Sequence, residues 1–265
     1  MENIEYTECF LVYLDILGIK KLVSEFDNKQ ELIKNLINVL KINTKFVNSN
    51  QKMTTAGNIN IRSWYFSDSF VFLMKDQPEN LSHLFLIVRY LQDRLFGEGY
   101  LLRGAIVKEK MYYPEDDENV LLGQGMIDAY KLESEIAIYP RVVISEKLLN
   151  YIKKEDIKAY PFGKDSIISL KELIKKDYDG IYFLDLLNEN ILRKKNEKIK
   201  NEGKRFSIFW ENSDDSNYNN IIEKVRHIII DYSDKSIKIK QKYDWLNSYL
   251  EQNDNRINQT LEETK

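Results

Sequence analysis

The sequence predicts an α+β fold, in which an antiparallel sheet of the split βαβ type, as in ferredoxin-like or palm folds, carries helices on one face. The first observation is size and composition: 265 residues, 43% hydrophobic and 31% charged, are enough for a large soluble domain with an appendage. The second is the order of apolar patterns, which runs strand, helix, hairpin, helix, strand. The third is a change in the sequence pattern near Lys153, which predicts a core domain at 1–152 and a C-terminal extension at 153–265.

The first two elements follow from the apolar run at the N-terminus. Thr7–Leu17 has the pattern of a buried strand, and Gly18 ends it. A long amphipathic helix is expected next, and a polar loop at Asn48–Asn58 follows it. The apolar positions of this helix are Leu22, Phe26, Leu32, Leu36, Ile37 and Leu40.

A hairpin and a second helix come next. Ile59–Tyr65 and Phe70–Met74 are strand-like, and Asp68 falls near the tip between them. Pro78–Phe96 has an apolar stripe at helical spacing, and Gly99–Lys108 is again strand-like. These elements complete the predicted split βαβ order.

Shorter elements close the core. The glycines Gly123 and Gly125 precede a predicted short helix at Met126–Glu135. Pro140–Ser145 is a short strand, and Ser145 caps a helix that begins near Glu146. The extension is predicted to contain a strand at Gly180–Leu184, a solvated basic stretch at Arg193–Lys204, a long helix at Asn217–Glu251 and a fraying polar tail after Asn253.

Charge and cysteine content restrict the class of protein. The net charge is −3, from 39 basic and 42 acidic side chains, and this balance makes nucleic acid an unlikely partner. No apolar run reaches about 18 residues, so we expect no membrane span. The acidic start Met1–Glu5 disfavours a signal peptide, and the single Cys9 cannot form an internal disulfide. The expected location is the cytoplasm.

Two aspartates interrupt otherwise apolar strand patterns. Asp15 lies within Phe10–Gly18, and Asp68 lies within Trp64–Leu73. An isolated buried carboxylate costs several kcal/mol (a rough scale), so each needs solvent, a partner or a metal. Two of them at neighbouring strand ends would form a hard-oxygen site for a divalent cation. Asp68 could instead be an ordinary turn residue.

The order of four motifs resembles the catalytic domain of class III nucleotidyl cyclases over about residues 7–150. The motifs are Tyr13–Gly18, Phe66–Ser69, Leu102–Ile106 and Gly123–Glu133. More narrowly, the chain is similar to divergent bacterial members, including the uridylate and cytidylate cyclases of Pycsar anti-phage systems. The closing stretch Lys242–Leu246 also resembles the end of many uncharacterised proteins of this group.

The resemblance implies a mechanism and a set of site residues. Asp15 and Asp68 would hold two Mg²⁺ or Mn²⁺ ions, with the Ile16 carbonyl as a further ligand. Backbone N–H groups of Leu17, Gly18 and Ile19 would bind phosphate oxygens. The substrate would be a nucleoside triphosphate, and the products a 3′,5′-cyclic nucleotide, serving as an anti-phage signal, and pyrophosphate. The active enzyme would be a head-to-tail homodimer.

Several positions depart from the family pattern. Ile127 and Lys131 stand where an asparagine and an arginine are typical, so Lys131 is the candidate transition-state cation and Asp128 the candidate ribose contact. Trp64 stands near the position of the purine-selecting lysine, which favours a pyrimidine base. Arg103 is a candidate triphosphate contact, although pairing with a carboxylate is an equal alternative, and Lys131 could simply be solvated.

Two other functions remain open at this point. A palm-type nucleotidyltransferase could use the same two-metal chemistry to join nucleotides. A catalytically inactive module could also have kept the fold for nucleotide binding or protein interaction, and Ile127 and Lys131 motivate this alternative.

Overall fold

The computed structural model describes residues 6–28, 30–31, 33–34, 36–38, 40–41, 61–66, 68–97, 99–113, 120–161, 166–188 and 236–263. Three predicted features lie outside these residues: the loop Asn48–Asn58, the basic stretch Arg193–Lys204 and the part of the C-terminal helix predicted before Ser236.

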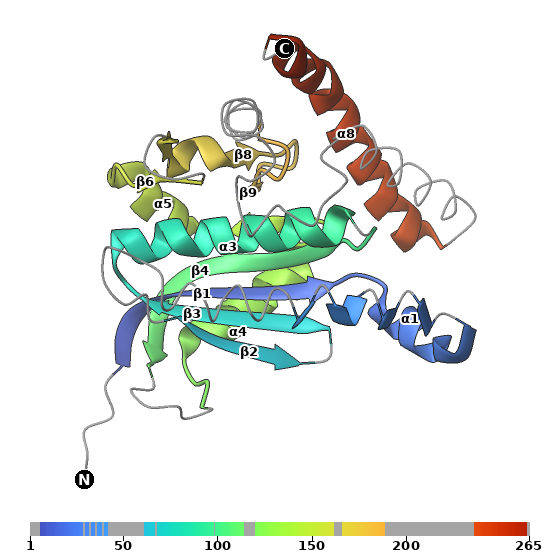
Figure 1. Cartoon of the computed structure of the whole chain (residues 1–265). Helices are drawn as coiled ribbons and strands as arrows, with labels where there is room; N and C mark the ends of the chain where they lie inside the picture. Colours follow the sequence, from blue (N-terminus) through green and yellow to red (C-terminus); the bar gives the residue numbers. More distant parts are fainter. Residues whose placement is uncertain are drawn as a thin grey trace.

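A seven-stranded sheet forms the centre of the protein, in the order β2-β3-β1-β4-β5-β9-β8 (Figure 1). Neighbouring strands run antiparallel except β4 and β5, which are parallel. The mixed α+β class with a mostly antiparallel sheet is therefore as predicted. The strands are β1 Tyr6–Ile16, β2 Arg62–Phe66, β3 Ser69–Lys75, β4 Leu102–Tyr112, β5 Val142–Ile144, β8 Ile174–Lys176 and β9 Tyr182–Leu184.

Helices cover both faces of the sheet. On one face, α3 (Pro78–Gly97) and α5 (Glu146–Lys154) pack against a cluster that includes Phe10 and Val12. On the other face, α4 (Gln124–Lys131) packs against a cluster that includes Leu11 and Val107. The expectation that helices lie on one face only is wrong, because β1 is apolar on both sides and each side must be covered.

The long helix predicted after β1 is interrupted by a turn. Helix α1 spans Ile19–Ser24, and a 3₁₀ turn, η1 (Phe26–Asn28), follows it. The turn is closed by hydrogen bonds from Glu25 N to Leu22 O and from Asn28 N to Glu25 O, at 3.3 and 3.0 Å. Asp27 and Asn28 favour turns over helix interiors, so they interrupt the predicted helix. Beyond the turn, residues 30–31, 33–34, 36–38 and 40–41 are helical again.

The C-terminal part continues the same sheet. Strands β8 and β9 extend it beyond β5, the short pair β6 (Lys158–Ala159) and β7 (Ile168–Ser169) forms a second sheet, and η3 (Leu170–Leu173) connects β7 to β8. The boundary predicted at residue 152 falls within α5.

Within the described residues, helix α8 spans Ile237–Glu263, so it continues beyond the end predicted at Glu251. The polar tail expected to fray after Asn253 is thus helical as far as Glu263. No helix in the described part of the chain is both long and apolar enough to span a bilayer.

The close approach of β4 to β1 requires glycine at position 104. A Cβ atom there would overlap the Tyr13 carbonyl oxygen and lie 2.8 Å from Leu14 Cδ2. Gly125 differs, since its added Cβ would meet the flexible Met111 side chain, with Sδ at 2.9 Å.

We therefore expect Gly104→Ala to lower the free energy of unfolding by about 3 kcal/mol, because the β1 backbone cannot move aside. Gly125→Ala should stay within about 1 kcal/mol of the wild type, since Met111 can adjust and alanine favours the helix. Urea unfolding followed by circular dichroism measures both. Equal effects of the two substitutions would contradict the close-approach argument.

Candidate active site

Asp15 and Asp68 come together at one end of the central strands. Asp15 is the penultimate residue of β1 and lies opposite Ser69, the first residue of β3. Asp68 directly precedes β3, and its carbonyl accepts a hydrogen bond from Ile16 N at 2.9 Å. The antiparallel register of β1 and β3 thus places the two aspartates at the same end of the sheet, as the sequence suggested.

Arg103 links this end of the sheet to α4. Asp15 and Arg103 are directly opposed in the β1–β4 register, and both project from the face that α4 covers. Arg103 Nε donates to Asp15 Oδ2 at 3.3 Å, and Arg103 Nη2 lies 2.6 Å from Glu133 Oε1. The Asp15 and Arg103 side chains remain 18% and 21% exposed, so the pair is still open to solvent.

Glu133 reaches Arg103 from a buried stripe of small residues. Gly125, Ala129, Glu133 and Ala137 recur every four positions, and all are buried. Glu133 lies in a π-helical turn, η2 (Leu132–Ile136), which Ala137 N closes by donating to Leu132 O at 2.8 Å. Such turns are frequent at functional sites. Burial raises the pKa of Glu133, while the charge of Arg103 opposes that rise.

Lys242 of α8 completes the group of charges. Burial, followed by the nearby Arg103 charge, lowers the Lys242 pKa, while Asp15 and Glu133 oppose this shift. Asp68 and Asp15 act on Glu133 in the direction that raises its pKa. The candidate site therefore combines three carboxylates, Asp15, Asp68 and Glu133, with two cations, Arg103 and Lys242.

The turn after β1 borders this site. Gly18 has φ +88°, a backbone region that favours glycine, and a Cβ atom at this position would meet nothing within 4 Å. Leu17 N donates to Leu101 O at 2.9 Å, so the expectation that this N–H binds phosphate conflicts with its position in the structure. Ile19 begins α1, where the first N–H groups of a helix lack partners within the helix.

Three other predicted site residues do not join the carboxylates within this chain. Trp64 lies opposite Val71 and is only 6% exposed in the core under α4, so its ring is not open to a base. Lys131 is exposed on α4, and together with Asp128 it lines a groove between α4 and α5. Gln124 Nε2 donates to Asp128 Oδ1 at 2.8 Å.

The donor set suits a hard divalent cation. Asp15 and Asp68 offer carboxylate oxygens at a partly open end of the sheet, and the backbone of Ile16 lies between them. Across the described ranges, no group of three or more histidine, cysteine or acidic side chains has metal-binding proximity. A metal here would therefore depend on these two carboxylates, with backbone carbonyls and water as further ligands.

Sequence reasoning missed Glu133 and Lys242. The signal for Glu133 was a charged residue in register with Gly125 and Ala129 on the packed face of a helix. The signal for Lys242 was its spacing of three and four residues from Trp245 and Leu246.

Comparison with known proteins finds similarity among solved structures only. No family model and no curated protein matches the chain. Among solved structures, the chain is similar to the monomeric guanylyl cyclase domain of the RhoGC fusion protein from the aquatic fungus Blastocladiella emersonii. The identity is 14% and the TM-score 0.40, over 68% of this chain and 95% of that one. At these values the likeness assigns no residue role to this chain.

The Arg103–Glu133 ion pair makes a thermodynamic prediction. We expect Arg103→Met to destabilise the protein by about 2–3 kcal/mol at neutral pH, because Glu133 is left buried without its cation. Adding Glu133→Gln should recover at least about 1 kcal/mol, since the uncompensated charge is gone. Urea unfolding of the wild type, both single variants and the double variant measures this coupling.

The stability effect of removing Arg103 should depend on pH in a defined direction. A carboxyl whose folded pKa is raised destabilises the folded state above that pKa, and the penalty disappears below the unfolded value of 4.5. The loss of unfolding free energy caused by Arg103→Met should therefore become smaller as the pH falls towards 4.5. If the effects of Arg103→Met and Glu133→Gln on the unfolding free energy were additive at every pH, the Arg103–Glu133 pairing would be contradicted.

Proposed function

We propose that the protein is a metal-dependent nucleotide cyclase, which converts a nucleoside triphosphate into a 3′,5′-cyclic nucleotide and pyrophosphate. The observation that carries the proposal is the placement of Asp15 and Asp68 at one end of β1 and β3, beside the open turn at Gly18. The strand order β2-β3-β1-β4, with antiparallel neighbours, is also that of a split βαβ sheet.

Asp15 and Asp68 would hold two Mg²⁺ or Mn²⁺ ions, with the Ile16 carbonyl as a further ligand. Divalent cations at this position would lower the pKa of the ribose 3′-hydroxyl and neutralise the triphosphate. Arg103 orients the Asp15 carboxylate through its Nε–H, and Glu133 fixes the other side of the guanidinium. The protein thus holds one proposed ligand in place before any cation arrives.

The phosphates would occupy the open side of the Gly18 turn. There the N–H groups of Gly18 and Ile19 lie at the start of α1, and Arg103 supplies positive charge nearby. The preference for a pyrimidine substrate is carried over from the Pycsar resemblance, because the buried Trp64 is not open to a base in this chain. In keeping with the Pycsar resemblance, the cyclic product would serve as an anti-phage signal.

The face of α4 supports a head-to-tail homodimer. Ile127 and Tyr130 are 63% and 55% exposed, and Phe66 at the end of β2 is also exposed. Apolar side chains on one face favour burial against a partner surface. Asp128 and Lys131 lie on this same exposed helix, so they would act in the site of the partner protomer rather than in their own.

The direct test is incubation of the full chain with each of the four nucleoside triphosphates and Mn²⁺, followed by mass spectrometry. We expect a cyclic mononucleotide, with a pyrimidine substrate preferred. Asp15→Asn and Asp68→Asn should each lower the rate by at least about 100-fold, because metal ligation contributes several kcal/mol. Asp156→Asn is the matched control, since Asp156 is an exposed carboxylate that pairs with Lys158.

Other outcomes would overturn the proposal in recognisable ways. Oligonucleotide products would identify a nucleotidyltransferase. Tight nucleotide binding without turnover would identify a non-catalytic module. Equal turnover by Asp15→Asn, Asp68→Asn and the wild type would show that these aspartates are not metal ligands.

A further inference from the structure

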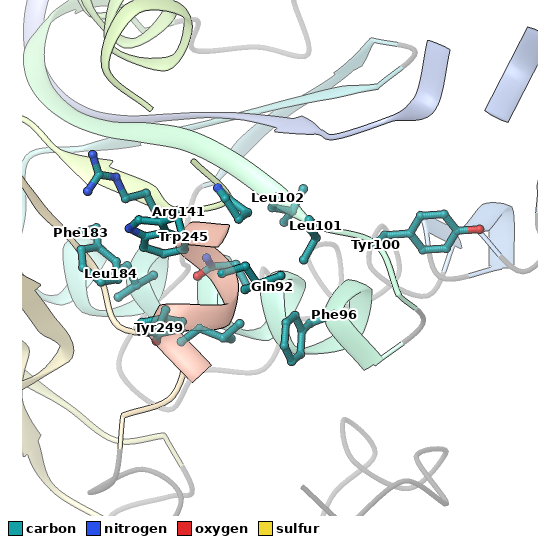
Figure 2. A pocket seen from close by; sticks show the side chains of 13 residues that line it. Gln92, Phe96, Tyr100, Leu101, Leu102, Arg141, Phe183, Leu184, Trp245 and Tyr249 are labelled. Atoms are coloured by element: carbon teal, nitrogen blue, oxygen red, sulfur yellow. The ribbon is translucent and has the colours of Figure 1, made fainter. Parts of the chain in front are cut away.

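Helix α8 docks on the body of the protein through one apolar stripe. Trp245, Leu246, Tyr249 and Leu250 are buried and pack against a cluster that includes Phe96, Leu101 and Phe183. Figure 2 shows Trp245 and Tyr249 beside Phe183 and Leu184, with Leu101 and Leu102 of the β4 end nearby. The stripe follows the three- and four-residue spacing of one helix face.

Polar contacts fix the position and register of α8. Trp245 Nε1 donates to Asp177 Oδ2 at 2.7 Å, and the Tyr249 hydroxyl donates to Asp185 Oδ1 at 2.6 Å. Arg141 pairs with Asp177, and its guanidinium lies 5.9 Å from the Trp245 ring centre. With these contacts on successive turns, the helix cannot slide or rotate without breaking buried hydrogen bonds.

Lys242 continues the docked stripe by one turn towards the site. It precedes Trp245 by three residues and Leu246 by four, so it shares their face of the helix. Its neighbour Tyr243 packs against the same buried cluster as Leu17. Leu17 N donates a hydrogen bond to Leu101 O. Leu17 lies two positions after Asp15, and Leu101 lies two positions before Arg103. Docking of α8 therefore carries a half-buried lysine to the carboxylate end of the sheet.

The residues that the structure describes give Lys242 no direct ion pair. In the described part of the chain, no carboxylate lies within 4 Å of the Lys242 ammonium, although Asp15 and Glu133 act on it at longer range. Arg103, in contrast, already contacts both of these carboxylates. Burial without a direct partner disfavours the charged form of Lys242, and an arriving anion would relieve that cost.

We propose that Lys242 is a polyphosphate-binding residue, which α8 supplies to the candidate active site from within the same chain. This inference rests on the proposed function and adds to it a phosphate contact at a position outside the motifs of the first 150 residues. It also gives the C-terminal extension a role, because the anchored helix holds the ammonium group where a triphosphate or a leaving pyrophosphate would lie.

The test is calorimetric titration of the full chain with inorganic pyrophosphate in the presence of Mg²⁺. We expect Lys242→Met to weaken binding about tenfold, since one charge-assisted contact is lost. Lys242→Arg should bind within about threefold of the wild type, because the charge remains. Lys240→Met is the matched control, as Lys240 lies on the same helix but is exposed. Circular dichroism checks that each variant retains its helix content.

Each result bears on a separate claim. If Lys242→Met binds pyrophosphate as tightly as the wild type, Lys242 has only a structural role and the inference is overturned, while cyclase activity can still be present. If Lys242→Met and Lys240→Met weaken binding equally, the effect is general electrostatics and the inference is also overturned. If the wild type neither binds pyrophosphate nor turns over a nucleotide, the proposed function fails together with the inference.

Discussion

Carboxylates that are half buried beside apolar strands need positive charge close by, and this requirement organises the candidate site. Asp15, Asp68 and Glu133 meet at one end of the central sheet, where Arg103 contacts two of them directly. Without that guanidinium, Glu133 would be a buried charge that has lost its direct ion-pair partner. A divalent cation would neutralise this same concentration of negative charge. The carboxylates that need a positive partner for stability are therefore also the ones proposed to take part in the chemistry.

The surrounding fold serves to bring these groups together. Gly104 lets β4 approach β1 closely, which places Arg103 opposite Asp15. The small residues Gly125 and Ala129 let α4 lie close to the sheet, and the π-helical turn that follows carries Glu133 to Arg103. From the far end of the chain, Trp245 and its partners hold α8 so that Lys242 faces the same end of the sheet.

Local patterns predicted six of the seven strands of the central sheet and the position of the two aspartates at strand ends, because each of these features depends on a short segment; the strand β8 was not predicted. Asp15 interrupts a strand, and strand register then determines which residues lie beside it. Glu133 and Lys242 were not predicted, because their partners are distant in sequence: Arg103 is 30 positions from Glu133, and the docking of α8 depends on Phe183 and Asp177. The expectation for Trp64 failed for a related reason, since burial under α4 is a tertiary effect that β-strand patterning does not reveal.

The central claim is that Asp15 and Asp68 bind divalent cations together with a nucleotide. Electron paramagnetic resonance of Mn²⁺, titrated into the full chain with a 3′-deoxynucleoside triphosphate that cannot cyclise, tests it most directly. We expect the nucleotide to increase the amount of Mn²⁺ that the wild type binds. Asp15→Asn and Asp68→Asn should each weaken this binding at least about tenfold, while Asp156→Asn should not. Equal Mn²⁺ binding by the wild type and both site variants would show that Asp15 and Asp68 do not bind the cations.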